Sequence, residues 1–183
     1  RSFGELILSG ASANMPVAVA LDGTIFVADP GHQQIVRFSS TGVFEASWQN
    51  GSFYFGGIAT DAFGHVYVSD FYNDRIQKFK FDGTHVRNIP GQRSAGLHVD
   101  FAGHLVVADL TRNAITRMSL DGEIYSVHSP TLADGGFNGL WGITTDEAGR
   151  VYTADLYDLL GRTIKVFQPV LPKYRQKTTF SVP

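Results

Sequence analysis

The sequence predicts an all-β fold: a β-propeller built of four-stranded antiparallel blades, with four blades in this chain. The first observation is a repeated segment in which an alternating strand lies between a turn glycine and a final aspartate. Its four copies are VALDGTIFVAD at 19–29, TDAFGHVYVSD at 60–70, VDFAGHLVVAD at 99–109 and TDEAGRVYTAD at 145–155. The second is their period, because the final aspartates lie 41, 39 and 46 residues apart. The third is a content of 20 glycines, as many tight turns require, together with the absence of any long stretch of helical period.

The second copy shows how one blade is built. Its alternating, β-branched and aromatic segments predict four strands, at 57–61, 65–69, 75–81 and 84–89. Gly64 lies in the first turn, where a positive φ is available to glycine. Asp82 and Gly83 are a hairpin signal between the third and fourth strands. Four antiparallel strands in a repeat of roughly 40 residues are typical of one propeller blade.

The other copies have the same order of elements. Their third strands are predicted at 35–38, 115–118 and 164–167. The blades therefore span about 15–48, 56–89, 95–128 and 141–167, within a single domain covering 1–183.

The second copy, GIATDAFGHVYVSDFYNDRIQKFKFDG, resembles an NHL repeat, and the resemblance extends over roughly 15–168. It implies a propeller that usually has six blades, in a family with protein-binding, RNA-binding, sensor and lyase- or lactonase-like members. The chain departs from that pattern because it has only four copies. Ala20 replaces the first aspartate of copy one, and copy four has three extra residues in its second turn.

Both ends of the chain contain a candidate fourth strand for the last blade, at 2–9 and at 177–182. Two candidates for one position indicate either a piece of a larger propeller or two chains that complete each other. Four blades of this geometry would leave apolar edges in water, which a two-fold partner would cover. We therefore expect a homo-oligomer, most simply a homodimer. The alternative to a dimer is a closed four-blade monomer, and the alternative to a functional module is an inactive propeller fragment.

The composition narrows the range of partners. The 15 basic and 17 acidic residues are interspersed and give a net charge of −2, so no basic stripe exists and we expect no nucleic-acid binding. No apolar run approaches the length of a membrane span, so we expect no membrane partner. The absence of cysteine excludes disulfide and thiolate chemistry and does not identify a compartment.

The repeated aspartates have a structural interpretation. Asp29, Asp70, Asp109 and Asp155 end second strands, where aspartate commonly accepts hydrogen bonds from turn N–H groups. Located one to a blade, they are too far apart to share an ion. Asp61, Asp100 and Asp146, which open the first turns, have the same interpretation.

His98 is the candidate for the central channel. Its equivalents in the other first strands are the small residues Ala18, Ala59 and Thr144, and first strands line the channel of a propeller. The alternative to a functional role is a histidine whose hydrogen bonds are satisfied by its neighbours.

We predict no cofactor and no metal. A lactonase- or lyase-like enzyme using Ca²⁺ or Zn²⁺ in the channel is the alternative, with Asn14 and Asn138 as possible ligands.

The leading prediction is a non-enzymatic module that binds a protein or peptide through one face. The loops from second to third strand and the loops entering each blade lie together on this face, called the loop face below. Both insertions, 156–162 and 129–141, fall there, and insertions in repeat proteins usually mark the binding face. Besides His98 and Asn138, the candidate binding residues are the large side chains of these loops: Tyr72, Arg75, Arg112, Phe137, Trp141, Tyr157 and Arg162. The alternative for Phe137 and Trp141 is packing beneath the longer loop.

Overall fold

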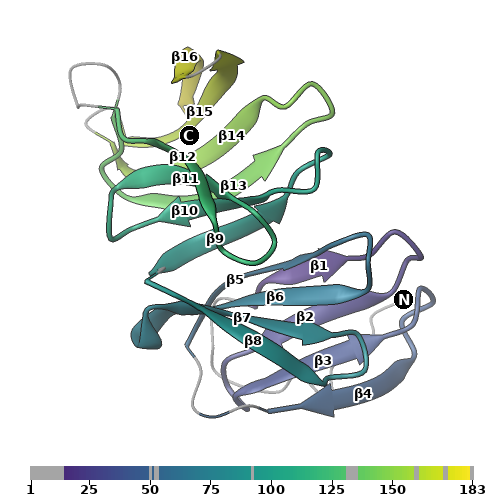
Figure 1. Ribbon diagram of the computed structural model, residues 1–183. Helices are drawn as coiled ribbons and strands as arrows, with labels where there is room; N and C mark the ends of the chain where they lie inside the picture. Colours follow the sequence, from purple (N-terminus) through teal and green to yellow (C-terminus); the bar gives the residue numbers. More distant parts are fainter. Residues whose placement is uncertain are drawn as a thin grey trace.

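The computed structural model describes residues 15–49, 51, 54–91, 93–130, 136–158, 161–170 and 173–181. Its strands form four separate antiparallel sheets, each with its strands in chain order (Figure 1). No helix in the described part of the chain is long and apolar enough to cross a membrane.

The first two blades are regular four-stranded meanders. Blade one contains β1 (Val17–Val19), β2 (Ile25–Asp29), β3 (Gln34–Phe38) and β4 (Phe44–Trp48). Blade two contains β5 (Phe55–Thr60), β6 (His65–Asp70), β7 (Arg75–Lys80) and β8 (His85–Pro90). A short 3₁₀ helix, Phe71–Asn73, joins β6 to β7, and Asp74 closes it in the left-handed conformation at φ 49°.

The last two blades have the same topology. Blade three contains β9 (Ser94–Val99), β10 (Leu105–Asp109), β11 (Ala114–Met118) and β12 (Ile124–His128). Blade four contains β13 (Leu140–Thr145), β14 (Val151–Asp158), β15 (Gly161–Val170) and β16 (Lys173–Ser181). The predicted all-β propeller with four four-stranded blades is therefore confirmed.

The structure assigns the fourth strand of the last blade to the C-terminal segment. β16 pairs with β15 from Ser181 opposite Thr163 to Lys173 opposite Val170. Blade four thus extends beyond the predicted end at 167, because β15 continues to Val170 and β16 belongs to the same sheet. β16 also starts at Lys173, earlier than the predicted 177. The alternative strand at 2–9 lies outside the described residues.

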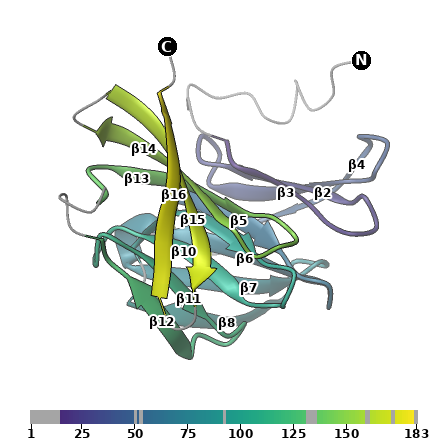
Figure 2. The same cartoon turned by 90° about the horizontal axis from the view of Figure 1, so that it is seen from above.

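The first strands of the four blades lie on the inner side of the arc. β1 packs against β5, β5 against β9, and β9 against β13, whereas β13 and β1 do not pack in this way. Among the described residues the arc is therefore not closed between blades one and four (Figure 2). On this open flank Val17 and Val19 are 57% and 62% exposed. The structure contains one chain, so the expected homo-oligomer stays a prediction.

The core lies between neighbouring blades and follows from the two-residue period of the strands. Phe26 and Ala28 of β2 pack toward blade two, whereas Val27 joins a cluster on the opposite face of the same sheet. Equivalent clusters join blade two to blade three and blade three to blade four. Each blade is therefore buried by its neighbours rather than by itself.

Glycines bring the starts of the first strands together. A Cβ built on Gly56 would lie 2.0 Å from the carbonyl oxygen of Ser94, and one on Gly96 would lie 2.7 Å from the carbonyl oxygen of Trp141. Neither contact tolerates a side chain, because the opposing atoms are backbone. The first strands of blades two, three and four therefore meet backbone to backbone at their N-terminal ends.

Candidate ligand cavity at the propeller axis

A cavity of about 1260 Å³ lies at the propeller axis and is lined by residues of all four blades. Its walls come from β1 and from the C-terminal halves of β5, β9 and β13, together with the turns that follow these strands. These turns are called the first turns below, and the face of the molecule that they form is the first-turn face. The glycine-packed N-terminal ends of β5, β9 and β13 do not contribute to the lining. The inner strands therefore spread apart toward the first-turn face, opposite the loop face.

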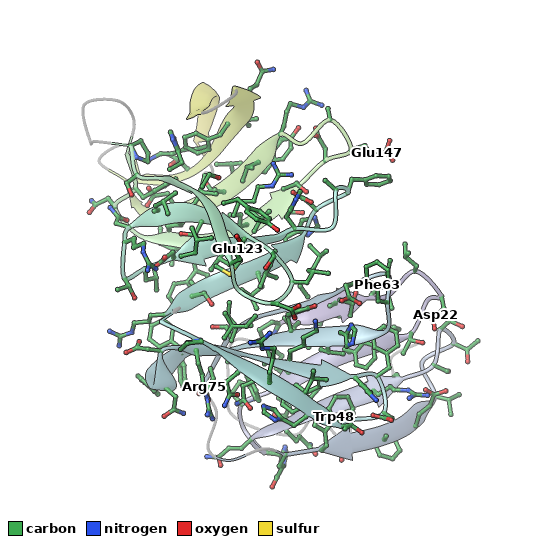
Figure 3. All side chains as sticks on the ribbon, viewed as in Figure 1. Asp22, Trp48, Phe63, Arg75, Glu123 and Glu147 are labelled. Atoms are coloured by element: carbon green, nitrogen blue, oxygen red, sulfur yellow. The ribbon has the colours of Figure 1, made fainter. Side chains whose placement is uncertain are left out.

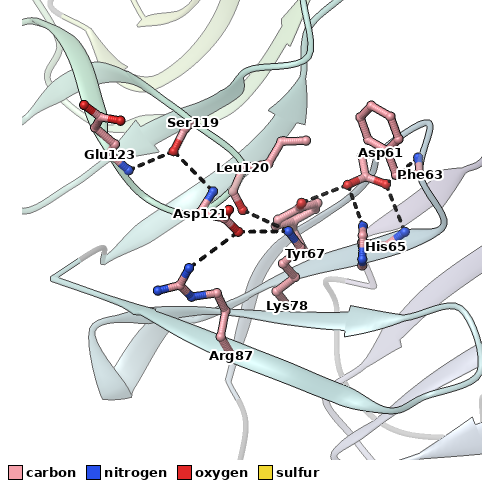
Figure 4. A network of polar contacts seen from close by, with 10 residues as sticks. All are labelled: Asp61, Phe63, His65, Tyr67, Lys78, Arg87, Ser119, Leu120, Asp121 and Glu123. Carbon is pink, nitrogen blue, oxygen red and sulfur yellow. Dashed lines mark hydrogen bonds and ion pairs between the residues drawn. The ribbon is translucent and has the colours of Figure 1, made fainter.

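The first turns are held by the aspartates that open them. Asp61 Oδ1 accepts hydrogen bonds from the backbone N–H groups of Phe63 and His65 at 2.8 and 2.9 Å. Its Oδ2 lies 2.9 Å from His65 Nδ1 and accepts a 2.9 Å bond from the hydroxyl of Tyr67, as Figure 4 shows. Burial, followed by the Asp61 carboxylate, raises the pKa of Tyr67, so the phenol remains a proton donor. Asp61 has the structural role that the sequence predicts.

Asp100 and Asp146 repeat this arrangement. Asp100 Oδ1 accepts from the N–H groups of Ala102 and His104, and its Oδ2 pairs with the guanidinium of Arg117. Asp146 accepts from the N–H group and the guanidinium of Arg150 and from the hydroxyl of Tyr152. Burial raises the pKa of Asp146, but these hydrogen bonds outweigh it and hold the pKa below its usual range. Asp146 is therefore ionised near neutral pH, and all three turn aspartates belong to the lining of the cavity.

Large apolar side chains surround the mouth of the cavity. Leu21, Phe63 and Phe101 line it from three successive first turns and are 90%, 75% and 82% exposed. Figure 3 shows Phe63 on the same side of the molecule as Asp22 and Glu147, away from Arg75. These three side chains are called the apolar rim below. The turns do not require these apolar side chains, because the hydrogen bonds that hold the turns are made by backbone N–H groups and by other side chains.

His98 lies among the cavity-lining residues, as do its small equivalents Ala18, Ala59 and Thr144. The side chain is half-buried. Burial lowers the pKa of His98, with the Asp100 carboxylate acting in the opposite direction. The imidazole is therefore neutral near pH 7 and adds no positive charge to the cavity.

The second-strand aspartates are buried and saturated with hydrogen bonds. Asp29, Asp70 and Asp109 are 0% exposed and Asp155 is 1% exposed. Asp29 accepts the N–H groups of Gly31 and His32, as the sequence predicts. Many donors are side chains instead: Asp70 accepts from Arg75 at 2.8 Å and from Gln77 at 3.0 Å, and Asp155 from Lys165 at 2.9 Å.

The structure places four of the predicted loop-face residues at or near the surface. Tyr72 is 66% exposed and its ring lies 4.8 Å from that of Tyr54. The Arg75 and Arg112 side chains are anchored on Asp70 and Asp109, at 2.8 and 2.7 Å. Asn138 is exposed, and its backbone N–H donates to Asp155 Oδ2 at 2.9 Å.

The other predicted loop-face residues are buried or half-buried, or have side chains that the structure does not describe. Phe137 is 1% exposed and packs on Phe167 at 5.4 Å, so its alternative role as a core residue is the one that the structure shows. Trp141 is half-buried in β13. Tyr157 and Arg162 belong to β14 and β15, but their side chains lie outside the described part, as does the whole of Asn14.

Sequence reasoning missed the apolar rim. Its signal is local: Leu21 and Phe101 directly follow the first residue of the turn, Phe63 comes one residue later, and each lies one or two residues before the turn glycine. Such positions are usually polar, so bulky apolar residues at three of the four turns are an unusual feature that the sequence alone already shows.

Fold and cavity together define the class of protein: a β-propeller of four-stranded blades with a concave axial site. The solved structures that resemble it include a catalytically inactive variant of virginiamycin B lyase from Staphylococcus aureus with quinupristin, at TM-score 0.71 and 19% identity over 96% of this chain and 58% of that chain. A streptogramin B lyase matches at TM-score 0.68 and 20% identity, over 91% and 54% of the two chains. Hydrazine synthase of Kuenenia stuttgartiensis matches at TM-score 0.71 and 12% identity, over 92% and 51%.

These likenesses show the fold alone, and the chain spans less than two thirds of the length of these proteins. No protein-family model and no curated protein sequence matches the chain, so the NHL resemblance stays a prediction. Among the described residues, no group of three or more His, Asp or Glu side chains could hold a metal ion.

Proposed function

We propose that the chain is a propeller binding module whose axial cavity holds a ligand with an apolar body. The observation that carries this proposal is the apolar rim. Leu21, Phe63 and Phe101 remain exposed at the mouth of a cavity of about 1260 Å³, which they line from three separate turns. Concave sites with apolar walls and a few polar groups are the usual form of ligand sites.

The polar groups of the lining fit binding better than catalysis. The carboxylates of Asp61, Asp100 and Asp146 are held in hydrogen bonds that shape the first turns. His98 is the only imidazole among the described lining residues. The lyase-like alternative is supported by the fold of the similar structures, and would require His98 to act with a partner. A divalent-metal mechanism finds no ligand group in the described part of the chain.

A neutral fluorescent probe, N-phenyl-1-naphthylamine, tests the cavity. We expect saturable binding with a blue-shifted emission, and Phe101→Ser should weaken it about tenfold because roughly half of an aromatic side chain no longer covers the probe. Val43→Ser is the matched control: Val43 is 62% exposed in a turn outside the cavity lining. Equal binding by wild type and Phe101→Ser, or no binding by either, would contradict the proposal.

Protein or peptide binding through the loop face is a second candidate, favoured by an exposed aromatic cluster. Tyr54 and Tyr72 are 45% and 66% exposed, and the ring of Phe71 lies 5.5 Å from that of Tyr72. The guanidinium of Arg93 stacks over Phe71 at 4.7 Å. Tyrosine and arginine are enriched among the residues that dominate binding energy at protein interfaces.

Selection of a random peptide library on the immobilised protein tests this second candidate. Peptides that bind the loop face should lose at least about tenfold in affinity with Tyr72→Ala. Tyr125→Ala serves as the control, because Tyr125 is 53% exposed on the outer strand of blade three. If no selected peptide distinguishes Tyr72→Ala from Tyr125→Ala, the loop-face proposal is wrong.

A further inference from the structure

The charge around the axial cavity is strongly one-sided. The first turns of the four blades carry five carboxylates, those of Asp22, Asp61, Asp100, Asp146 and Glu147. Arg117 pairs with Asp100 and Arg150 pairs with Asp146. The other three carboxylates have no guanidinium or ammonium within ion-pair distance among the described residues.

The surroundings of these three carboxylates do not neutralise their charge. Asp61 is bonded to an imidazole and a phenol, which carry no fixed positive charge. Asp22 accepts the backbone N–H of Thr24 at 2.9 Å, and this hydrogen bond lowers the pKa of its exposed carboxyl. Glu147 lines the cavity and is exposed. The mouth therefore keeps a net negative charge at pH 7, which a bound cation would offset.

The apolar rim and the carboxylates occupy the same turns. Leu21 precedes Asp22, Phe63 follows Asp61 by two residues, and Phe101 directly follows Asp100. A ligand that touches the rim therefore comes near the carboxylates as well. Aromatic faces also attract cations, so Phe63 and Phe101 suit a positively charged group as well as an apolar body.

We propose that the axial cavity recognises cationic amphiphiles, molecules that join an apolar body to an ammonium or guanidinium group. This inference rests on the proposed function, because it names the class of ligand for the same cavity. The apolar body lies against Leu21, Phe63 and Phe101, and the cationic group faces the exposed carboxylate of Glu147, next to the other carboxylates of the first turns. Anionic amphiphiles of the same length are disfavoured by these carboxylates.

Displacement of N-phenyl-1-naphthylamine by three amphiphiles with the same eight-carbon chain tests the inference. Octyltrimethylammonium, octyl glucoside and octyl sulfate are each titrated below their micelle concentrations. We expect octyltrimethylammonium to displace the dye at about a tenfold lower concentration than octyl glucoside, and octyl sulfate to be the weakest. The preference should shrink as salt is raised, because Asp22 and Glu147 are exposed to solvent.

Glu147→Gln should reduce the preference for octyltrimethylammonium over octyl glucoside about threefold, the effect of one exposed charge. Glu123→Gln is the matched control, since Glu123 is an exposed carboxylate outside the cavity lining. Equal displacement by the three amphiphiles would overturn the inference and leave the proposed function standing. A dye that does not bind at all would overturn both.

Discussion

Replacement of Gly56 by alanine is expected to destabilise the protein by at least about 3 kcal/mol, the upper end of the usual cost of overpacking a core. The new Cβ would lie 2.0 Å from the carbonyl oxygen of Ser94 and 2.9 Å from Ser69 Oγ. Because the first of these atoms is backbone of the neighbouring blade, relief requires the inner strands to move apart. Thermal unfolding should show a melting temperature lowered by roughly 6–12 °C.

Gly142→Ala is the control for this experiment. Gly142 also lies in an inner strand, β13, but a Cβ there would meet only Ala154 Cβ at 3.5 Å, an ordinary van der Waals contact. We expect the free energy of unfolding to change by less than about 1 kcal/mol. Equal destabilisation by Gly56→Ala and Gly142→Ala would mean that the close approach of the inner strands is not the reason why position 56 requires glycine.

Lys165→Met is expected to cost about 3–5 kcal/mol, the usual effect of removing one partner of a buried ion pair. The side chains of Lys165 and Asp155 are 2% and 0% exposed, and Nζ lies 2.9 Å from Asp155 Oδ2. Nζ also donates to the carbonyl oxygen of Gly136 and lies 5.7 Å from the centre of the Phe137 ring. Methionine preserves the volume but leaves the carboxylate without its cation. Chemical denaturation measures the loss.

Two further variants distinguish charge from packing at Lys165. The double variant Lys165→Met with Asp155→Asn should recover part of the loss, because no uncompensated charge stays buried. Lys78→Met should cost only about 1 kcal/mol or less, since the partner of Lys78, Asp121, is 65% exposed. If Lys165→Met is no more damaging than Lys78→Met, the ion pair in blade four does not stabilise the fold as described.

The repeat made the architecture readable from sequence because each blade is a local unit. Antiparallel strands joined by short turns pair residues of the same copy, so the four second-strand aspartates predicted four equivalent structural positions. The donors to these aspartates were harder to predict. The third-strand residue two positions beyond the one that pairs with the aspartate changes from Gln77 to Thr116 to Lys165, and each supplies a different hydrogen bond.

By itself, the sequence determined the fold class, the approximate strands, the structural role of the turn aspartates and the position of His98 in a first strand. Tertiary structure alone decided that Phe137 is core, that β16 completes the last blade, and that the cavity opens on the first-turn face. The physical reason is that these features depend on contacts between blades. Glycines bring the first strands of blades two, three and four together at one end of the axis, and Leu21, Phe63 and Phe101 line one cavity only when separate repeats are arranged around the other end.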